Sequence, residues 1–451
     1  MEELDSWSEP FDKHGTWWRP DAQATSVAGT LAYSPSRGLQ LTTSGMPHLA
    51  SLSDEPIVIN GRVNEQHWTL GACLGTSSSG SGQTFHVGYA VADLAMNSDE
   101  VASLDEIRVG FDGLWSAVGL PPRSRQLLGQ ESFSVTAAIG DGWSVELMSE
   151  LVDRELPGEG AFGYEDRVQF VGRAPTPTGF LDLLRHVFVP LRDLMTIALQ
   201  DGVVANYCSV SGPGTVVMVG SQHKRQRGFA YWDQITTPES TREEQRPQVA
   251  LRLPTTPDQF QQLVAGWFQV HGRLETPIAL RIADLIGGMS FSEPRFLHAA
   301  QSLEALHRRL HPDEIDKDAA EARAAALDAV DAHHRSKLAS RLSHAHEPTY
   351  RARIKQLVRD AEPQASEVVG TNLKSAVSHL VDVRNAVTHW DPSSEPPDGL
   401  ILVSLRLVAD AIFDLVLLKQ VGLDDAALQV TTRAHRSKQV EYWLSRALES
   451  S

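Results

Sequence analysis

One short stretch of the sequence, Arg384-Asn385-x-x-x-His389, places an arginine, an asparagine and a histidine within six positions. A guanidinium holds anions through several N–H donors, and an imidazole exchanges protons near neutral pH. These side chains could form a reaction centre, or they could be polar residues that merely close a helix. The spacing alone does not decide, because Arg341 and His346 repeat it elsewhere in the chain.

The residues before His389 have the periodicity of an amphipathic helix. Arg384 lies on its apolar stripe, where an unpaired charge would be very costly, so we expect it to be paired or put to use. Asn385 and His389 lie on an adjoining polar face, because they are four positions apart. Pro392 disfavours helix at Asp391 and so puts His389 in the last turn, where a helix C-terminus favours the protonated imidazole. The apolar stripe comprises Leu373, Ala376, Val377, Leu380, Val383 and Val387.

The expected partner of Arg384 is Glu304, in the segment "FLHAAQSLEALHRRL". Glu304 lies four positions after Ala300, at the edge of a second apolar helical stripe. A glutamate at the edge of one stripe could meet the arginine of another. The alternative is a buried ion pair that only joins two helices. The second Arg-x4-His pair lies in a highly polar stretch and has no comparable setting.

The bulk properties are those of a folded, intracellular protein. Its 451 residues suit two or three domains, and 41% hydrophobic with 22% charged residues is typical of a soluble chain. Two cysteines, Cys73 and Cys208, cannot build a disulfide framework and fit a reducing compartment. The acidic N-terminus lacks the apolar segment of a signal peptide. The longest apolar run, Leu400–Leu418, contains three charged residues, which favours a bundle helix over a membrane span. We therefore expect a cytoplasmic protein without a membrane segment.

Charge and motifs exclude several classes of function. The formal net charge of −17 repels phosphate, so any binding of nucleic acid must be confined to a local patch. No P-loop, GxSxG or HExxH motif is present, so nucleotide hydrolysis, α/β-hydrolase and zincin chemistry have no support. We expect neither a metal nor a cofactor, because the histidines that cluster in sequence match no standard zinc spacing. These are His333, His334, His344 and His346.

The two halves of the sequence differ in pattern and predict an α+β multidomain protein. In residues 1–250, short period-2 apolar runs separated by turn residues indicate the strands of a sandwich or barrel-like sheet. In residues 256–451, the 3.6-residue period of the apolar positions predicts an all-α bundle. We place the domain boundary between these ranges.

Four local features of the β-rich half lead to predictions. The Ser/Gly-rich Gly75–Gln83 is expected to be a flexible loop or hairpin tip. Pro190 should kink or break the one long helix of this half. The alternating "QVALRLP", at 248–254, is expected to be its closing strand. At least one residue of the pair Trp17-Trp18 should anchor the core.

Two parts of the sequence resemble known families. The stretch "DVRNAVTHW" resembles the RNxxxH motif of HEPN ribonucleases, and the glutamate of "QSLEALHRRL" resembles their acidic residue on an earlier helix. The opening "FDKHGTWWRPDAQATSVAGTLAYSPSRGLQLTTSG", with the following "HWTLGACLG", resembles the N-terminal domain of ApeA-type anti-phage proteins. The domain order agrees as well, whereas residues 90–250 are similar only in their general pattern of short apolar runs and turn residues. The N-terminal positions that match are Gly15, Trp17, Trp18, Pro20, Gly29, Leu31, Tyr33, Gly38, Leu41 and Gly45.

The resemblance implies a β-rich sensor or regulatory domain at 1–250 and a HEPN ribonuclease domain at 256–451. Such a protein would act as a toxin in abortive infection, held silent until a phage protein binds the N-terminal domain. The alternative is a non-catalytic HEPN dimer that serves as an RNA-binding or protein-interaction scaffold.

For the site, the resemblance implies metal-independent cleavage of RNA by its own 2′-OH. His389 would move protons and Arg384 would stabilise the charge gathering on phosphorus. Asn385 would orient the phosphate or the imidazole, and Glu304 would hold Arg384. One histidine per chain is few for both acid and base work. A homodimer through the HEPN domain is therefore expected to bring two Arg/His pairs into one cleft.

Two basic segments could contact the RNA, whether tRNA or mRNA. In "SQHKRQRGFAYWD", basic residues stand beside aromatics that could stack on bases, although a turn leading into a strand agrees better with the alternating aromatics. Residues 333–359 are locally basic, with a solvated helix face as an equal alternative. The candidate residues are Lys224, Arg225, Arg227, Arg341, Arg351, Arg353 and Lys355.

Overall fold

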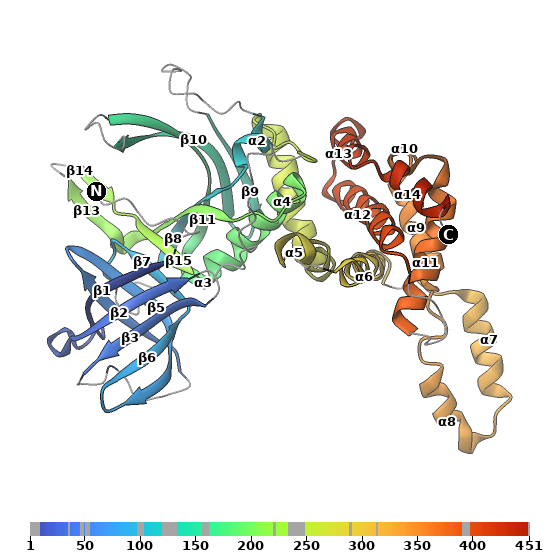
Figure 1. The fold of residues 1–451 in the computed structure, drawn as a ribbon, viewed down its shortest axis with the longest axis horizontal. Coiled ribbons are helices and arrows are strands. Elements are labelled where there is room, and N and C mark those ends of the chain that lie inside the picture. The colour runs from blue at the N-terminus through green and yellow to red at the C-terminus, as the bar shows by residue number, and fades with distance from the viewer. Residues whose placement is uncertain are drawn as a thin grey trace. The chain divides into compact units, whose positions relative to one another are not determined.

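The chain forms two compact units, which a computed structural model shows (Figure 1). One unit consists of residues up to 247 with 252–269, and the other of 248–251 with residues from 270 onward. The first is β-rich and the second is helical, which confirms the predicted α+β fold class. The structure describes residues 10–34, 37–45, 49, 55–96, 103–119, 133–155, 162–219, 222–232, 249–287, 291–312, 314–389 and 397–449.

Six antiparallel strands of the first unit close into a barrel. They are β1 (Phe11–Trp18), β2 (Val27–Ser34), β3 (Gly38–Ser44), β4 (Ile57–Val63), β5 (Gln66–Ser79) and β6 (Gly82–Val87). The order around the barrel is β1-β2-β3-β6-β5-β4, and it closes because β4 pairs with both β5 and β1. Closure removes the free sheet edges that invite aggregation. A 3-10 turn, η1 (Gln23–Thr25), precedes β2.

The tryptophan pair lies in the barrel core, as predicted. Trp17 is fully buried and Trp18 is 7% exposed. The ring of Trp17 packs directly on Gly61, where an added Cβ would lie 2.1 Å from a ring carbon. Any larger residue at this position of β4 would therefore displace the central side chain of the barrel.

The N-terminal residues that resemble the ApeA family form this core and its turns. Leu31, Tyr33 and Leu41 are buried at 2% exposure or less. Gly38 and Gly45 have φ values of 69° and 86°, a backbone conformation that favours glycine. These positions of the family pattern therefore contribute to the core and the turns of a small barrel.

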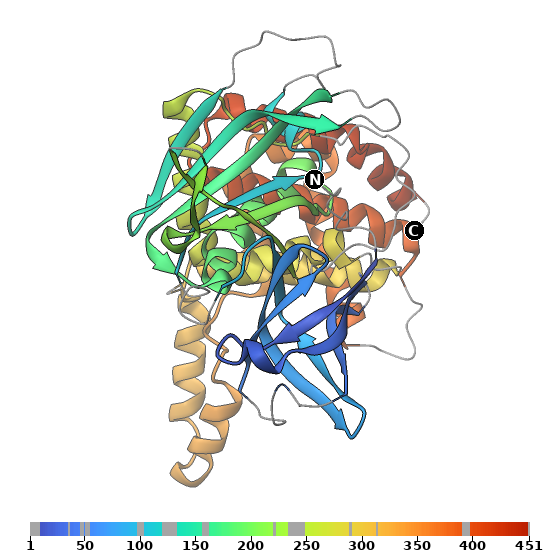
Figure 2. The ribbon, with the colours of Figure 1, turned by 90° about the vertical axis from the view of Figure 1, so that its left-hand side faces the viewer.

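The sheet continues beyond the barrel through β7, which pairs with β5. The further order is β7-β15-β12-β8-β11-β10-β9, with all described pairs antiparallel. Figure 2 shows the blue barrel strands and the long green strands from a second side. A separate hairpin joins β13 and β14. The bounds are β7 (Tyr89–Ala92), β8 (Leu104–Phe111), β9 (Ser134–Gly140), β10 (Trp143–Glu155), β11 (Phe162–Thr178), β12 (Ala205–Ser211), β13 (Val216–Val219), β14 (Gln222–Arg225) and β15 (Gly228–Trp232).

One irregular helix packs against this open part of the sheet. It consists of α3 (Phe180–Leu183), the π-helical turn η2 (Leu184–Phe188) and α4 (Val189–Leu199). Pro190 lies in the first turn of α4, so the irregular turn before it agrees with the predicted kink. Phe180 and Phe188 pack edge-on against Trp232, with ring centroids 5.8 and 4.7 Å away. The short elements of this unit are α2 (Leu114–Val118) and η3 (Pro213–Thr215).

The Ser/Gly-rich Gly75–Gln83 lies in a hairpin, which is one of the two forms predicted for it: Gly75–Ser79 continues β5, and Ser79 pairs with Gly82 across a tight turn. One prediction in this half needs correction. The described part of the predicted closing strand, 249–254, is not a strand. Leu251 and Leu253 are buried on either side of the exposed Arg252, along an irregular connection. Burial of alternate side chains therefore does not require strand pairing.

Helix α5 (Pro257–Gly287) is shared by the two units: residues to Gln269 belong to the first, and later residues belong to the second. The helix is kinked at Leu274, three positions before Pro277, which lacks the N–H that would continue the helical hydrogen bonds. Secondary structure thus changes near residue 257, whereas the packing unit changes near residue 270. The predicted domain limits stay a prediction.

Helix α12 (Gly399–Val421) is the central helix of the second unit. It contacts α6, α9, α10, α11, α13 and α14, and it is buried along most of its length, as expected of a bundle helix. It ends at Gly422, whose φ of 92° fits the predicted C-cap. No helix in the described ranges is long and apolar enough to cross a membrane. The other helices are α6 (Ser292–Leu310), α7 (Lys317–Asp328), α8 (Ala332–Arg341), α9 (Tyr350–Ala361), α10 (Gln364–Val369), η4 (Gly370–Asn372), α11 (Leu373–His389), α13 (Asp425–Ser437) and α14 (Val440–Glu449).

Helices α7 and α8 form a hairpin, called the arm below, that projects from the helical unit (Figures 1 and 2). Neither helix has a buried residue. The base of the arm is fixed by the Asp316 N–H, which donates to the His346 carbonyl at 2.9 Å, and by Arg323 Nε, which donates to the Leu342 carbonyl at 2.9 Å. The arm is therefore attached at its base and exposed along its length.

Candidate functional site

The RNxxxH stretch occupies the last turns of α11, where burial declines. Leu380 is fully buried, but Val383 and Val387 are half-buried and Asn385 is exposed. Helix α11 packs against α6, α9, α10 and α12. The apolar stripe is therefore a core stripe over its first turns and reaches the surface of the described chain at its end.

Arg384 meets Glu304 of α6, and the predicted contact between them is confirmed. Nη2 donates to Oε2 at 3.0 Å, with the two side chains 21% and 22% exposed. Arg384 thus lies at the edge of the stripe, which corrects the expectation of a buried position. Helical periodicity gives the direction of a side chain but not how far the neighbouring helices extend. A partly exposed pair of this kind contributes about 1 kcal/mol or less to stability.

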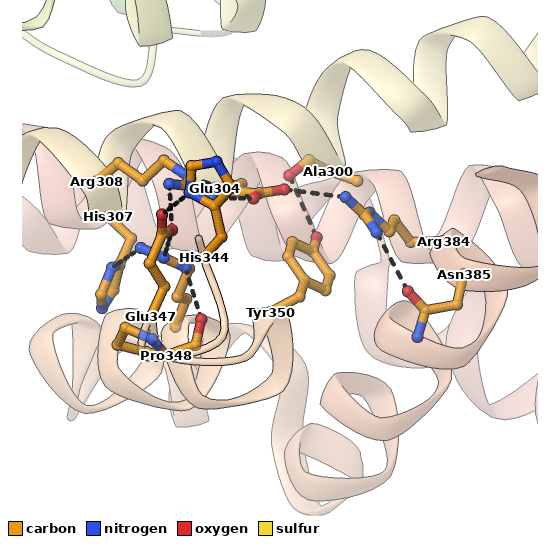
Figure 3. A network of polar contacts seen from close by, with 11 residues as sticks. Ala300, Glu304, His307, Arg308, His344, Glu347, Pro348, Tyr350, Arg384 and Asn385 are labelled. Carbon is orange, nitrogen blue, oxygen red and sulfur yellow. Dashed lines mark hydrogen bonds and ion pairs between the residues drawn. The ribbon is translucent and has the colours of Figure 1, made fainter. Parts of the chain in front are cut away.

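Tyr350, which the sequence did not single out, lies beneath the arginine. The Cζ atom of Arg384 is 4.8 Å from the centre of the tyrosine ring. The tyrosine hydroxyl donates to the carbonyl of Ala300 at 3.2 Å, and Arg384 Nη1 donates to the side-chain oxygen of Asn385 at 3.2 Å. Figure 3 shows these residues together. Only the threonine before Tyr350, an N-cap residue, indicated that a helix begins here.

Glu304 is shared between two guanidinium groups. Its Oε1 accepts from Arg308 Nη2 at 3.2 Å, while Oε2 accepts from Arg384. Arg308 Nη1 in turn donates to Glu347 (Figure 3). Glu347 also accepts from Arg353 Nη2 at 2.8 Å. The hydrogen bond with the nearby His344 imidazole, together with Arg308, holds the pKa of Glu347 below its usual value. Positive and negative side chains therefore alternate along a chain of contacts from Arg384 through Glu304 and Arg308 to Glu347, which lies in the loop between the arm and α9.

His389 is the last residue of α11, in agreement with the expected last turn. Its side chain lies outside the described residues. The repeat of the spacing has a different setting: Arg341 ends α8, whereas His346 lies in the loop before α9. This second pair therefore does not share a helix face.

The predicted RNA-binding residues of the helical unit separate into three kinds. Arg341 and Lys355 are exposed. Arg351 is engaged with Asp382 at 2.7 Å and is partly exposed. Arg353 is only 4% exposed and donates to the carbonyl of Pro348 and to Glu347, so its guanidinium is engaged within the chain. A run of basic residues does not reveal which members face inward.

The basic segment of the β-rich unit behaves as the strand interpretation predicts. Tyr231 and Trp232 are buried at 2% and 7% exposure, so they are core residues and not a stacking surface. Arg225 pairs with Asp105 at 2.7 Å, and Arg227 Nε lies 3.9 Å from the nearest Glu106 oxygen. The side chain of Lys224 lies outside the described residues.

A second, fully buried ionic cluster joins α5, α12 and α13. Arg281 donates to both oxygens of Asp414, at 3.0 and 2.9 Å, with side chains 1% and 0% exposed. His435 Nε2 lies 3.0 Å from the same carboxylate. Burial alone would raise the pKa of Asp414, but the charge of Arg281 holds it below its ordinary value. In the sequence, the charged residues within the apolar run that forms α12 were the one indication of this cluster.

Within the described ranges, no group of three or more histidine, cysteine, aspartate or glutamate side chains is arranged to hold a metal ion. Both cysteines are buried and unpaired. Burial raises the pKa of each thiol, so neither is a ready nucleophile.

A barrel-bearing β unit followed by a helical bundle with an RNxxxH helix defines a two-part protein of the HEPN class. Two family models match the chain: ApeA N-terminal domain 1 over residues 12–267, and Apea-like HEPN over residues 297–427. Because the first covers more than half of the sequence, the chain belongs to the ApeA-like family. It is thus an ApeA-like defence protein with a HEPN domain, a domain that is generally a ribonuclease. Comparisons with curated proteins and with solved structures found no match.

Proposed function

We propose that this protein is an endoribonuclease that acts in the cytoplasm as the toxin of an abortive-infection response. The observation that supports this most directly is Arg384, held at the edge of the bundle by Glu304 with a fifth of its side chain exposed. Partial exposure lowers the desolvation cost of any ion pair, and here it also leaves the guanidinium accessible to a ligand. A cation that receives a phosphate needs this access, because a bidentate guanidinium matches phosphate oxygens.

The proposed reaction needs no metal ion. The 2′-oxygen of a ribose attacks the adjacent phosphorus as its proton is removed, and the 5′-oxygen leaves with a proton. The products are a 2′,3′-cyclic phosphate and a 5′-hydroxyl end. His389 moves these protons, and Arg384 stabilises the charge on the phosphoryl oxygens. Asn385, next to the guanidinium, orients the phosphate or the imidazole.

A second copy of the chain completes this site in the proposal. One imidazole is few for both removal and delivery of a proton, so a homodimer would place two His389 side chains in one cleft. The end of α11 supports this arrangement, because Val383 and Val387 are only half-buried and Asn385 is exposed in the single chain. HEPN domains typically dimerise and bind RNA. In this proposal, the surface at the end of α11 is therefore assigned to both the second copy and the RNA.

RNA contacts and the trigger are assigned to separate surfaces. Arg341, the last residue of α8 at the base of the arm, and Lys355 on α9 are exposed and belong to a locally basic stretch. Basic side chains of this kind bind the backbone of tRNA or mRNA without reading its sequence. The β-rich unit is the proposed receptor for a phage protein, whose binding would shift the arrangement of the HEPN pair.

Cleavage of total RNA by the purified chain tests the proposal. We expect wild type to produce fragments with 2′,3′-cyclic phosphate ends in buffer with EDTA, and His389→Ala and Arg384→Ala to produce none. Arg309→Ala, on the exposed side of α6, is a matched control that should cleave like wild type. Cleavage that requires a divalent cation, or that survives His389→Ala, would overturn the mechanism.

One observation favours a scaffold as the second candidate. Both Glu304 oxygens are engaged by arginines, as in a structural ion pair that joins helices. In that case, wild type and His389→Ala would leave cellular RNA equally intact while both still dimerised. Comparing total RNA from cells that express each chain separates the two functions.

A further inference from the structure

Tyr350 is fixed at its backbone and at its hydroxyl. It is the first residue of α9, and the Thr349 hydroxyl before it caps this helix by accepting from the Ala352 N–H at 3.2 Å. The tyrosine hydroxyl donates to the carbonyl of Ala300, one helical turn before Glu304 in α6. Burial raises the pKa of this hydroxyl, so it remains a neutral donor at physiological pH. The ring is therefore held between α6 and α9.

The guanidinium of Arg384 is in contact with three other groups. Its centre lies 4.8 Å from the tyrosine ring, which attracts the cation through the electron-rich face. Two of its five N–H donors bind Glu304 and Asn385, among the contacts of the described residues. An ion pair alone would leave the guanidinium plane free to turn. A ring contact added to two directional hydrogen bonds restricts that rotation.

We propose that Tyr350 is a positioning residue, which holds the guanidinium plane of Arg384 so that its remaining N–H donors meet the phosphate. This inference rests on the proposed function, because it assigns a role within the same site. Tyr350 touches neither the phosphate nor the reacting oxygens in this proposal. It acts through Arg384, and preorganised donors stabilise charge that develops in the transition state. Its loss should therefore lower kcat more than it changes KM.

The first test replaces Tyr350 by Phe and by Met in the full-length chain, with kcat and KM measured on RNA. Phe keeps the ring and loses only the hydroxyl, so we expect kcat within about threefold of wild type. Met fills similar space without a ring face, so kcat should fall roughly 3- to 30-fold with KM nearly unchanged. Equal kcat for Met and wild type would overturn the inference.

A graded series avoids the ambiguity of a folding defect. Phenylalanine with one, two or three ring fluorines at position 350 removes electron density from the ring face with little change of shape. We expect log kcat to fall steadily with the number of fluorines, because the attraction for the cation falls with it. A flat series would show that the ring only fills space. Tyr207→Met is the matched control for Tyr350→Met. Tyr207 makes the same kind of contact with an arginine, Arg167, at 4.3 Å in the β-rich unit.

Stability measurements separate this inference from the proposed function. The single variants Tyr350→Met and Arg384→Met and the double variant are compared by their urea midpoints. If the ring holds the guanidinium, the double variant loses less stability than the sum of the single losses. Strict additivity would overturn the contact even in an active enzyme. Non-additivity in a chain that cleaves no RNA would retain the contact and reject the ribonuclease.

Discussion

Two of the arginine–carboxylate pairs in the helical unit differ mainly in their exposure. Arg281 and Asp414 are 1% and 0% exposed, and the arginine donates to both carboxylate oxygens. Arg384 and Glu304 are 21% and 22% exposed, with one hydrogen bond between them. The buried pair is sealed from any ligand, whereas the edge pair leaves room for one. Solvent access, and not the presence of a charge on an apolar stripe, separates a structural pair from a candidate site.

The largest expected effect comes from removing the arginine at the edge. We expect Arg384→Ala to lower the rate of RNA cleavage by roughly 10³-fold, since a preorganised donor for transition-state charge is lost. The melting temperature should change little, because a partly exposed pair contributes little to stability. Cleavage assays and thermal melts of the same sample check both statements. A collapse of stability would show that the two pairs are alike after all.

The buried pair should respond in the opposite way. Asp414→Asn leaves Arg281 buried without its full counter-charge, so we expect a loss of about 3–5 kcal/mol in the free energy of unfolding. Urea denaturation measures this loss. A loss below 1 kcal/mol would mean that Asp410, whose oxygen lies 3.5 Å from Arg281 Nε, compensates the buried cation.

Glu304→Gln sharpens the comparison with a smaller effect. The amide keeps a hydrogen-bond acceptor for Arg384 but removes the negative charge. We expect about a tenfold lower kcat and less than 1 kcal/mol of lost stability. The matching change at the buried pair, Asp414→Asn, should give the reverse order of effects. Equal stability losses for the two amide variants would contradict the distinction.

A further effect of modest size is a pH dependence of stability beside the edge pair. Burial, with the adjacent His311, lowers the pKa of His307 from its usual 6.5 to about 4. Between these values the unfolded chain binds a proton that the folded chain refuses, so stability falls as pH is lowered through this window. His307→Gln should reduce the stability difference between pH 7 and pH 5 by on the order of 1–2 kcal/mol. Urea midpoints at both pH values provide the check, and an unchanged difference would exclude His307 as the cause.

The sequence was sufficient for the fold class and for one contact of the site. Period-2 and 3.6-residue patterns separated the two halves, and the two helical stripes paired Glu304 with Arg384 correctly. Tyr350 could not be found this way, because its role depends on how α9 approaches α6 and α11. The burial of Arg353 could not be predicted for the same reason. Periodicity along one helix carries no information on the length or angle of its neighbours.

The shared helix α5 has a practical consequence for dissecting the protein. Phe260, Leu263 and Trp267 lie in its first half and are at most 1% exposed, and the indole N–H of Trp267 donates to the carbonyl of Pro190 at 2.8 Å. A truncated chain that starts at 256, where the helical pattern begins, would release these three side chains from the β-rich unit to water. Such a fragment would be prone to aggregate, and its toxicity or silence would report on exposed apolar surface and not on lost regulation. A fragment that starts near residue 270 leaves this face behind, but it also lacks 248–251, which belongs to the helical unit and whose Ala250 carbonyl accepts from the Thr431 hydroxyl at 2.8 Å.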